Sequence, residues 1–131
     1  HRSPAMTTSF TLPGTQTTPT ISADWDLGLL QMSGDSYPEN SFDFFTSTLD
    51  WVESYLRQEN RPLRLELRLV YMNTSSVKVM MDIFDLLEEA HREGRDVGVD
   101  WFFDSRNERV ELLAEEFRED CTFPFRISAE T

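Results

Sequence analysis

The stretch that decides the fold is residues 63–78, which read LRLELRLVYMNTSSVK. Over residues 63–71 apolar and polar side chains alternate, and this predicts a β-strand with its odd-numbered side chains on one buried face. The next residues, 73–76, carry short side chains with oxygen atoms, which are favoured at the start of a helix. From Val77 apolar residues recur at steps of three and four until Gly94, which predicts a helix. A strand, a loop and a helix in succession are typical of α/β proteins.

The same alternation of strand and helix extends outward in both directions. Apolar residues at helical spacing begin at Ser41 and predict a helix of about four to five turns that stops before Pro62. Further along, Ser105 and Glu108 have the spacing of a capping box, which predicts the start of a third helix. The remaining strands are predicted at residues 29–33, 97–103 and 123–129.

The N-terminal part of the chain is rich in threonine, serine and proline. Two short alternating runs, residues 9–12 and 19–23, flank Pro13-Gly14 and predict a hairpin at the edge of the sheet. Residues 1–5 are interpreted as a vector remnant, and residues 6–131 are expected to form a single regulatory domain. The predicted order of elements is β-β-β-α-β-α-β-α-β, an α/β class with a mixed sheet.

Three crossover helices are expected mainly on one face of this sheet. Strands separated by helices pair in parallel through right-handed crossovers. The strands at 63–71 and 97–103 alternate instead of being apolar throughout, so only one face of each is expected to be covered. The same topology brings the loops 34–40, 72–76 and 104–107 to one rim, at the carboxyl ends of the strands, where α/β proteins bind ligands.

The composition excludes several classes of partner. The 131 residues include 12 Lys plus Arg against 24 Asp plus Glu, for a formal net charge of -12. Such an acidic surface repels nucleic acid and anionic lipid. No apolar run approaches the roughly 20 residues of a spanning helix, so we expect neither nucleic-acid binding nor direct membrane insertion. The single cysteine, Cys121, cannot form an internal disulfide, which is typical of a cytoplasmic protein.

The predicted rim is rich in hydroxyl groups but has no histidine that could act as a general base. His91 and Cys121 are expected at the opposite rim, and acidic pairs such as Glu88-Glu89 are expected on solvated helix faces. The sequence has no dinucleotide-binding, Walker or zinc-protease motif. No catalytic residue, metal site or cofactor is therefore predicted, and a small hydrolase using the serine-rich rim is the weaker alternative to a non-enzymatic binding protein.

The hydroxyl-rich helix start allows two interpretations. It is either an ordinary helix cap or a place where the positive end of the helix holds a phosphate. Lys78, the only lysine in the chain, lies in the first turn of the helix. A phosphate attached to Thr74 or Ser75 would gain from this cation. The alternative is that Lys78 pairs with an acidic neighbour such as Asp35 or Asp82.

Six segments of the chain carry a resemblance to a known family. They are residues 13–19 (PGTQTTP), 34–41 (GDSYPENS), 69–78 (LVYMNTSSVK), 80–87 (MMDIFDLL), 106–110 (RNERV) and 114–121 (AEEFREDC). Together, in register over residues 10–126, they resemble the SiaC-family regulatory phosphoproteins. The resemblance implies the STAS-like fold of anti-sigma-factor antagonists, in agreement with the order of elements above. It also implies a phosphoacceptor that matches Thr74, with Ser75 as the alternative.

The resemblance further implies a bacterial partner-switching circuit. A Ser/Thr protein kinase (SiaB-like) would phosphorylate the protein, and a metal-dependent Ser/Thr phosphatase (SiaA-like) would reverse the reaction. The unphosphorylated protein would bind and activate a diguanylate cyclase (SiaD-like), raising cyclic di-GMP and promoting biofilm or aggregation. The alternative is an adaptor of the anti-sigma-factor-antagonist type that binds a kinase or anti-sigma partner without a cyclase.

The residues expected to support the phosphate or to contact a partner lie on the three loops of the predicted rim. Besides Thr74 they are Tyr37, Pro38, Glu39, Asn40, Met72, Asn73, Ser75, Ser76, Lys78 and Arg106.

Overall fold

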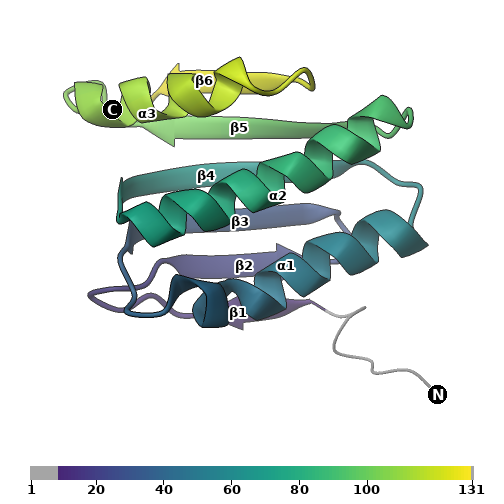
Figure 1. Cartoon of the computed structure of the whole chain (residues 1–131), viewed down its shortest axis with the longest axis horizontal. Coiled ribbons are helices and arrows are strands. Elements are labelled where there is room, and N and C mark those ends of the chain that lie inside the picture. Colours follow the sequence, from purple (N-terminus) through teal and green to yellow (C-terminus); the bar gives the residue numbers. More distant parts are fainter. Residues whose placement is uncertain (1–8, 131) are drawn as a thin grey trace.

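The computed structural model describes residues 9–130, in which three helices lie against a six-stranded sheet (Figure 1). The strands are β1 (Phe10–Leu12), β2 (Thr20–Asp24), β3 (Leu29–Ser36), β4 (Leu63–Met72), β5 (Val97–Phe103) and β6 (Phe125–Ala129). The helices are α1 (Ser41–Gln58), α2 (Thr74–Arg92) and α3 (Glu108–Glu119). The residues interpreted as a vector remnant, 1–5, lie outside the described residues.

The strands follow one another across the sheet in sequence order, from β1 at one edge to β6 at the other. β1, β2 and β3 pair antiparallel, which confirms the predicted hairpin at the edge, while β3 to β6 pair in parallel. Each crossover therefore moves in the same direction, and right-handed crossovers then place every helix on the same face. Figure 1 shows α1, α2 and α3 in front of the sheet, which confirms the predicted fold class.

The two faces of the sheet differ as the alternation predicts. The leucines of β4 at positions 63, 65, 67 and 69 are buried beneath the helices. On the opposite face, the polar residues of the sheet form ion pairs between neighbouring strands and turns: Arg64 with Asp96 at 3.2 Å, Arg68 with Glu130 at 2.9 Å and Arg126 with Asp100 at 2.7 Å. No helix within residues 9–130 combines the length and apolar character needed to cross a membrane.

A β-bulge near the end of β4 changes which side chains face the core. The register with β3 passes from Gly34 opposite Leu69 to Ser36 opposite Met72, so that Val70 and Tyr71 together lie opposite Asp35. After such a bulge the alternation of faces is inverted. Met72 is accordingly buried and Tyr71 is 51% exposed. The prediction that all odd-numbered side chains of this strand are buried is therefore wrong at Tyr71, as is the predicted end of β3 at Ser33.

Two other predicted ends are wrong for local reasons. α3 begins after Asn107, whose side-chain oxygen accepts a hydrogen bond from the Val110 N–H, so Ser105 is not the cap. The preceding loop is held by the Asp104 carboxylate, which accepts the backbone N–H of Arg106 at 2.9 Å and delays the helix start. β6 begins at Phe125 and not at Phe123, because the intervening Pro124 has no N–H with which to extend the ladder.

Glu88 joins α2 to the segment between α3 and β6. The sequence predicts a solvated carboxylate here, but Glu88 is buried. Its two oxygens accept hydrogen bonds from the Thr122 N–H at 2.8 Å, the Thr122 hydroxyl at 2.6 Å and the Arg92 Nε–H at 3.1 Å. The hydrogen bonds from Thr122 hold the pKa of the Glu88 carboxyl below its ordinary value, with a smaller contribution from Arg92. The prediction fails because the partner, Thr122, lies 34 positions away.

The Glu88→Ala variant is expected to lose about 1–3 kcal/mol of unfolding free energy at pH 7, because the N–H and the hydroxyl of Thr122 then lose the acceptor that they share. The folded-state pKa is lowered, so this contribution is present above the ordinary glutamate pKa of 4.5 and is lost as the pH falls through the folded-state value. Urea denaturation of the variant and the parent at several pH values measures the difference. Glu89→Ala, on the adjacent exposed carboxylate, is the matched control. An equal loss in both variants would show that Glu88 contributes nothing specific.

Candidate functional site

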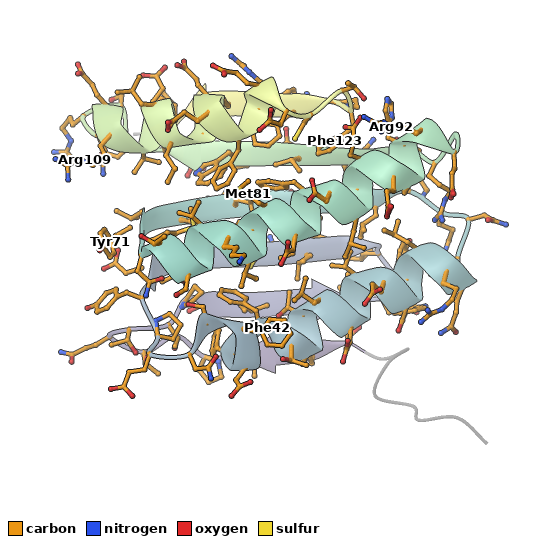
Figure 2. The ribbon with its side chains drawn as sticks, in the orientation of Figure 1. Phe42, Tyr71, Met81, Arg92, Arg109 and Phe123 are labelled. Atoms are coloured by element: carbon orange, nitrogen blue, oxygen red, sulfur yellow. The ribbon has the colours of Figure 1, made fainter. Side chains whose placement is uncertain are left out.

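The candidate site lies where β3 and β4 end and α1 and α2 begin. The Asn73 N–H donates to the Ser36 carbonyl at 3.0 Å, so the two strand ends are joined directly. Figure 2 shows Tyr71 at this end of the sheet, beside the start of α2, and Phe42 in the first turn of α1. The parallel pairing of β3 with β4 thus brings together the predicted loops 34–40 and 72–76, although residues 34–36 of the first belong to β3.

Serine hydroxyls form a network between the two helix starts, which is buried except at Ser75. The Ser41 hydroxyl lies 2.8 Å from that of Ser75 and 3.1 Å from that of Ser76, and the Ser76 hydroxyl lies 2.9 Å from that of Ser36. Ser36, Ser41 and Ser76 are no more than 1% exposed. Ser41 was absent from the predicted site, because nothing in the local sequence shows that α1 begins against α2.

Asn73 holds the loop between β3 and α1 against α2. Its side-chain oxygen accepts the Ser76 N–H at 2.9 Å and the Ser75 hydroxyl at 3.3 Å. Its side-chain NH2 donates to the Pro38 carbonyl at 3.3 Å. Asn73 is therefore the N-cap of α2 and also a bridge between the two loops.

The three consecutive hydroxyl residues at the start of α2 differ in their hydrogen bonds: Thr74 and Ser75 are both exposed, but only the Ser75 hydroxyl is bonded. Ser76 is fully buried, and Ser75 is bonded to Ser41 and Asn73. Thr74 is exposed, and its hydroxyl has no hydrogen-bond partner among residues 9–130. The backbone N–H groups of Thr74 and Ser75 likewise have no acceptor within this range. The arrangement therefore presents one free hydroxyl beside two free donors at the positive end of a helix.

Lys78 is exposed, four residues after Thr74 and so on the same side of α2. Its side chain forms no ion pair or hydrogen bond with any residue that the structure describes, so pairing with Asp35 or Asp82 is not observed. Its ammonium group is therefore available to an anion at the helix start.

Arg106 pairs with Asp104 and not with the start of α2. Its guanidinium donates to both oxygens of Asp104, at 3.0 and 2.7 Å, and these hydrogen bonds lower the pKa of Asp104 to about 2. It lines a hollow with Arg68, Val70 and Phe102 and forms no hydrogen bond or ion pair with residues 73–78. The structure thus places Arg106 on the rim but does not join it to the helix start of α2.

The rim also carries an exposed aromatic pair. The rings of Tyr37 and Tyr71 lie 5.5 Å apart, edge to face, and the two residues are 40% and 51% exposed. Tyr71 was missed by the sequence prediction because the bulge that exposes it depends on the pairing with β3. Among the predicted residues, Glu39 and Asn40 are also exposed, whereas Pro38 and Met72 are buried and support the loop.

Cys121 and His91, the other residues considered for catalysis, are both packed against neighbouring residues. Burial raises the pKa of the Cys121 thiol to about 11, and the thiol donates to the Phe117 carbonyl. The His91 ring packs edge to face against Phe123. Among residues 9–130 no group of three or more His, Cys, Asp or Glu side chains is placed to hold a metal ion.

Comparison with known proteins gives one family. The model of the SiaC family of regulatory phosphoproteins matches residues 12–130. An uncharacterised protein of Pseudomonas aeruginosa (strain UCBPP-PA14) is 63% identical over 118 residues, which cover 90% of this chain and 94% of the relative.

Solved structures agree with this finding. The crystal structure of the diguanylate cyclase SiaD in complex with its activator SiaC, from Pseudomonas aeruginosa, contains a chain that is 61% identical, with a TM-score of 0.90. The match covers 92% of this chain and 99% of that one. SiaC of Pseudomonas aeruginosa in a separate structure is 58% identical with a TM-score of 0.89, covering 94% and 99% of the two chains.

Proposed function

Because the chain belongs to the SiaC family of regulatory phosphoproteins, we propose that it is a non-enzymatic regulator whose unphosphorylated form binds and activates a diguanylate cyclase. The observation that carries the proposal is the likeness, over nearly the whole domain, to a chain from the complex of SiaD with its activator. The protein would act in the cytoplasm, where the cyclase finds its nucleotide substrate. The activated cyclase would produce cyclic di-GMP, which promotes biofilm formation or aggregation.

Phosphorylation of Thr74 is proposed to control this binding. A SiaB-like Ser/Thr kinase adds the phosphate, and a SiaA-like metal-dependent phosphatase removes it. Both Thr74 and Ser75 are exposed, but the Thr74 hydroxyl is free among the described residues, whereas the Ser75 hydroxyl is engaged by Ser41 and Asn73, and this supports Thr74. A kinase can reach the Thr74 hydroxyl without breaking the network that joins α1 to α2.

The domain has the means to hold the added phosphate. The free N–H groups of Thr74 and Ser75 and the dipole of α2 favour an anion at this position. Lys78, unpaired among the described residues, adds a positive charge on the same side of the helix. Phosphorylation adds about 1.5 to 2 negative charges, so the modified state is stabilised within the domain while its outer surface changes in charge.

The surface beside Thr74 suits an activator that is switched by charge. The exposed side chains of Tyr37 and Tyr71 offer apolar and aromatic area, of the kind that dominates protein interfaces. A partner packed on them would have to desolvate a phosphate on Thr74, and burying an unpaired charge costs several kcal/mol. The phosphate would therefore release the cyclase from this surface.

The acceptor can be identified by treating the protein with its kinase and ATP and mapping the phosphate by mass spectrometry. Cleavage after Arg68 and Lys78 isolates residues 69–78, so fragmentation of a single peptide distinguishes Thr74 from Ser75. We expect phosphate on Thr74, its loss in Thr74→Ala and its retention in the matched Ser75→Ala variant. Phosphate on Ser75 in the parent protein would refute the assignment.

A kinase that modifies the protein while no cyclase binds it would favour the alternative, an adaptor of the anti-sigma-factor-antagonist type. Binding to the cyclase SiaD of Pseudomonas aeruginosa, measured by calorimetry, separates the two functions. An affinity that is lost on phosphorylation supports the activator, and the absence of binding in either state supports the adaptor.

A further inference from the structure

A groove runs between α1 and α2 on the outer surface of the helical layer, away from the sheet. It has a volume of about 360 Å³ and begins at Phe42, in the first turn of α1. The residues that line it are Phe42, Thr46, Leu49, Asp50 and Glu53 of α1 and Asp82, Asp85 and Leu86 of α2. The α1 residues from Phe42 to Glu53 span three turns, about 16 Å along the helix axis, so the groove offers the length of about three turns of a bound helix.

The floor of the groove is apolar and incompletely covered. Phe42 is 62% exposed, and Leu49 and Leu86 are only partly buried. An exposed phenylalanine in continuity with two leucines is the arrangement with which helix-binding grooves receive the apolar face of an amphipathic helix. The domain core does not need this ring, because α1 is already anchored by Phe45, Trp51 and Tyr55.

The walls of the groove carry only negative charge. Asp50 and Glu53 lie on one side and Asp82 and Asp85 on the other. None of the four carboxylates forms an ion pair within residues 9–130, although the same range contains six such pairs elsewhere. Four unpaired carboxylates along an apolar floor favour a ligand with positive charge on both sides of an apolar stripe.

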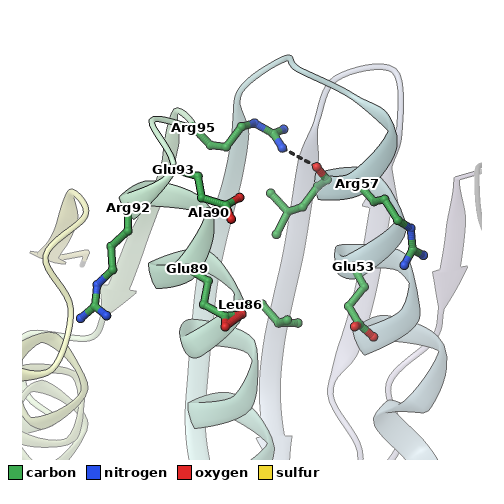
Figure 3. A pocket seen from close by; sticks show the side chains of 9 residues that line it. Glu53, Arg57, Leu86, Glu89, Ala90, Arg92, Glu93 and Arg95 are labelled. Carbon is green, nitrogen blue, oxygen red and sulfur yellow. Dashed lines mark hydrogen bonds between the residues drawn. The ribbon is translucent and has the colours of Figure 1, made fainter.

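Two cations adjoin the groove: Lys78 is four residues before Asp82 on α2, and Arg57 is four residues after Glu53 on α1. Neither forms an ion pair within residues 9–130, and neither lines the groove itself. Figure 3 shows the adjoining hollow, where Glu53 and Leu86 are shared with the groove, Glu89 extends from α2 and Glu93 follows its last residue. There Arg95 donates to the Leu56 carbonyl, and Arg92 extends from α2 away from α1, where it pairs with Glu88. Arg92 and Arg95 are therefore engaged outside the groove, and none of the groove's four carboxylates forms an ion pair with a cation of residues 9–130.

From this combination we propose that the α1–α2 groove binds a basic amphipathic helix of a protein partner, with leucine-like side chains on its apolar face and Lys or Arg on both flanks. A second copy of this chain does not fit, because its net charge of -12 would bring more carboxylates to the groove. The proposal depends on neither the cyclase nor phosphorylation.

The groove is expected to act independently of Thr74. Asp82 lies eight residues beyond Thr74 on α2, about 12 Å along the axis, which exceeds the screening length of about 8 Å at physiological ionic strength. A phosphate at the helix start therefore changes the potential at the centre of the groove only weakly. The occupant would remain bound in both phosphorylation states.

The test uses a blocked helical peptide of about 18 residues, with leucines at i, i+4, i+7 and i+11 and lysines on both flanks. Its affinity for the full chain is measured by fluorescence anisotropy, together with a scrambled peptide of the same composition. We expect micromolar binding of the first peptide and at least about tenfold weaker binding of the second. Phe42→Ala should weaken binding by about tenfold, and the double variant Asp82→Asn, Asp85→Asn by about three- to tenfold.

The matched control is Glu116→Gln, Glu119→Gln, which removes two exposed carboxylates from α3 and leaves the groove intact. It should change the affinity by less than about twofold. Equal weakening by the two double variants, equal binding of the two peptides, or no binding at about 1 mM peptide would overturn the proposal. Thr74→Glu separates it from the proposed function: peptide affinity should stay within about twofold, while binding of the cyclase is weakened.

Discussion

Complete phosphorylation of Thr74 is expected to weaken binding to the cyclase SiaD by at least about a hundredfold, equivalent to about 2.7 kcal/mol, and to abolish its activation. The physical reason is the position of Thr74 beside the exposed Tyr37 and Tyr71 rings. A partner that covers these rings must remove water from a phosphate that the domain itself already stabilises, and it gains no compensating charge pair unless it supplies a cation.

The measurement combines calorimetry with the rate of cyclic di-GMP formation by SiaD of Pseudomonas aeruginosa. The phosphorylated sample is prepared with the kinase and checked by intact mass. Thr74→Ala should activate the cyclase and no longer respond to the kinase. Thr74→Asp should give an intermediate loss, because one carboxylate carries less charge than a phosphate.

Two further variants test the mechanism of the switch. Ser75→Ala should retain regulation, since the Ser75 hydroxyl bonds to Ser41 and the proposed phosphoacceptor is Thr74. Tyr71→Ala should weaken cyclase binding by about tenfold while leaving Thr74 open to the kinase. A phosphorylated protein that activates the cyclase as well as the unmodified one would contradict the proposed switch.

Gly28→Ala is expected to cause the largest loss of stability, about 3–5 kcal/mol, and to lower the melting temperature by more than about 10 °C. Gly28 has φ of 63°, which L side chains adopt at a cost of about 1–2 kcal/mol. A Cβ there would also lie 2.4 Å from the Pro62 carbonyl oxygen and 2.4 Å from the Tyr55 hydroxyl. Those two groups are themselves hydrogen-bonded at 2.9 Å, so neither moves without breaking that bond.

Gly94→Ala is the matched control for this effect. Gly94 also has positive φ, 90°, but nothing lies within 4 Å of a Cβ built there. Its replacement by alanine should therefore lower the unfolding free energy only by the backbone strain, about 1–2 kcal/mol. Thermal or urea denaturation of the two variants separates strain from steric overlap, and equal losses would show that the contact around Gly28 relaxes freely.

Much of the architecture follows from local patterns. The alternation from Leu63 to Leu69 predicts a strand with one buried face, and the spacing of three and four after Ser41 and Val77 predicts the helices that cover it. Right-handed crossovers then leave a single arrangement for β3 to β6. These predictions hold because the spacing of apolar residues along the chain defines one apolar face on each strand and helix. Packing the helices against the sheet buries those faces.

The wrong predictions share one physical cause. Tyr71 is exposed because of a bulge against β3, and Glu88 is buried because it accepts hydrogen bonds from Thr122. In both cases the deciding partner comes from another element. No periodicity in the sequence reports such a partner.

The sequence by itself determined the order of the elements, the placement of the helices on one face and the presence of a hydroxyl-rich helix start at Thr74 beside the chain's only lysine. Only the tertiary structure distinguished the hydroxyls at that start. Ser75 and Ser76 are tied to Ser41, at separations of 34 and 35 positions, whereas Thr74 stays free. Hydrogen bonds over such separations form only once α1 and α2 pack side by side, and the same packing creates the acidic groove between them.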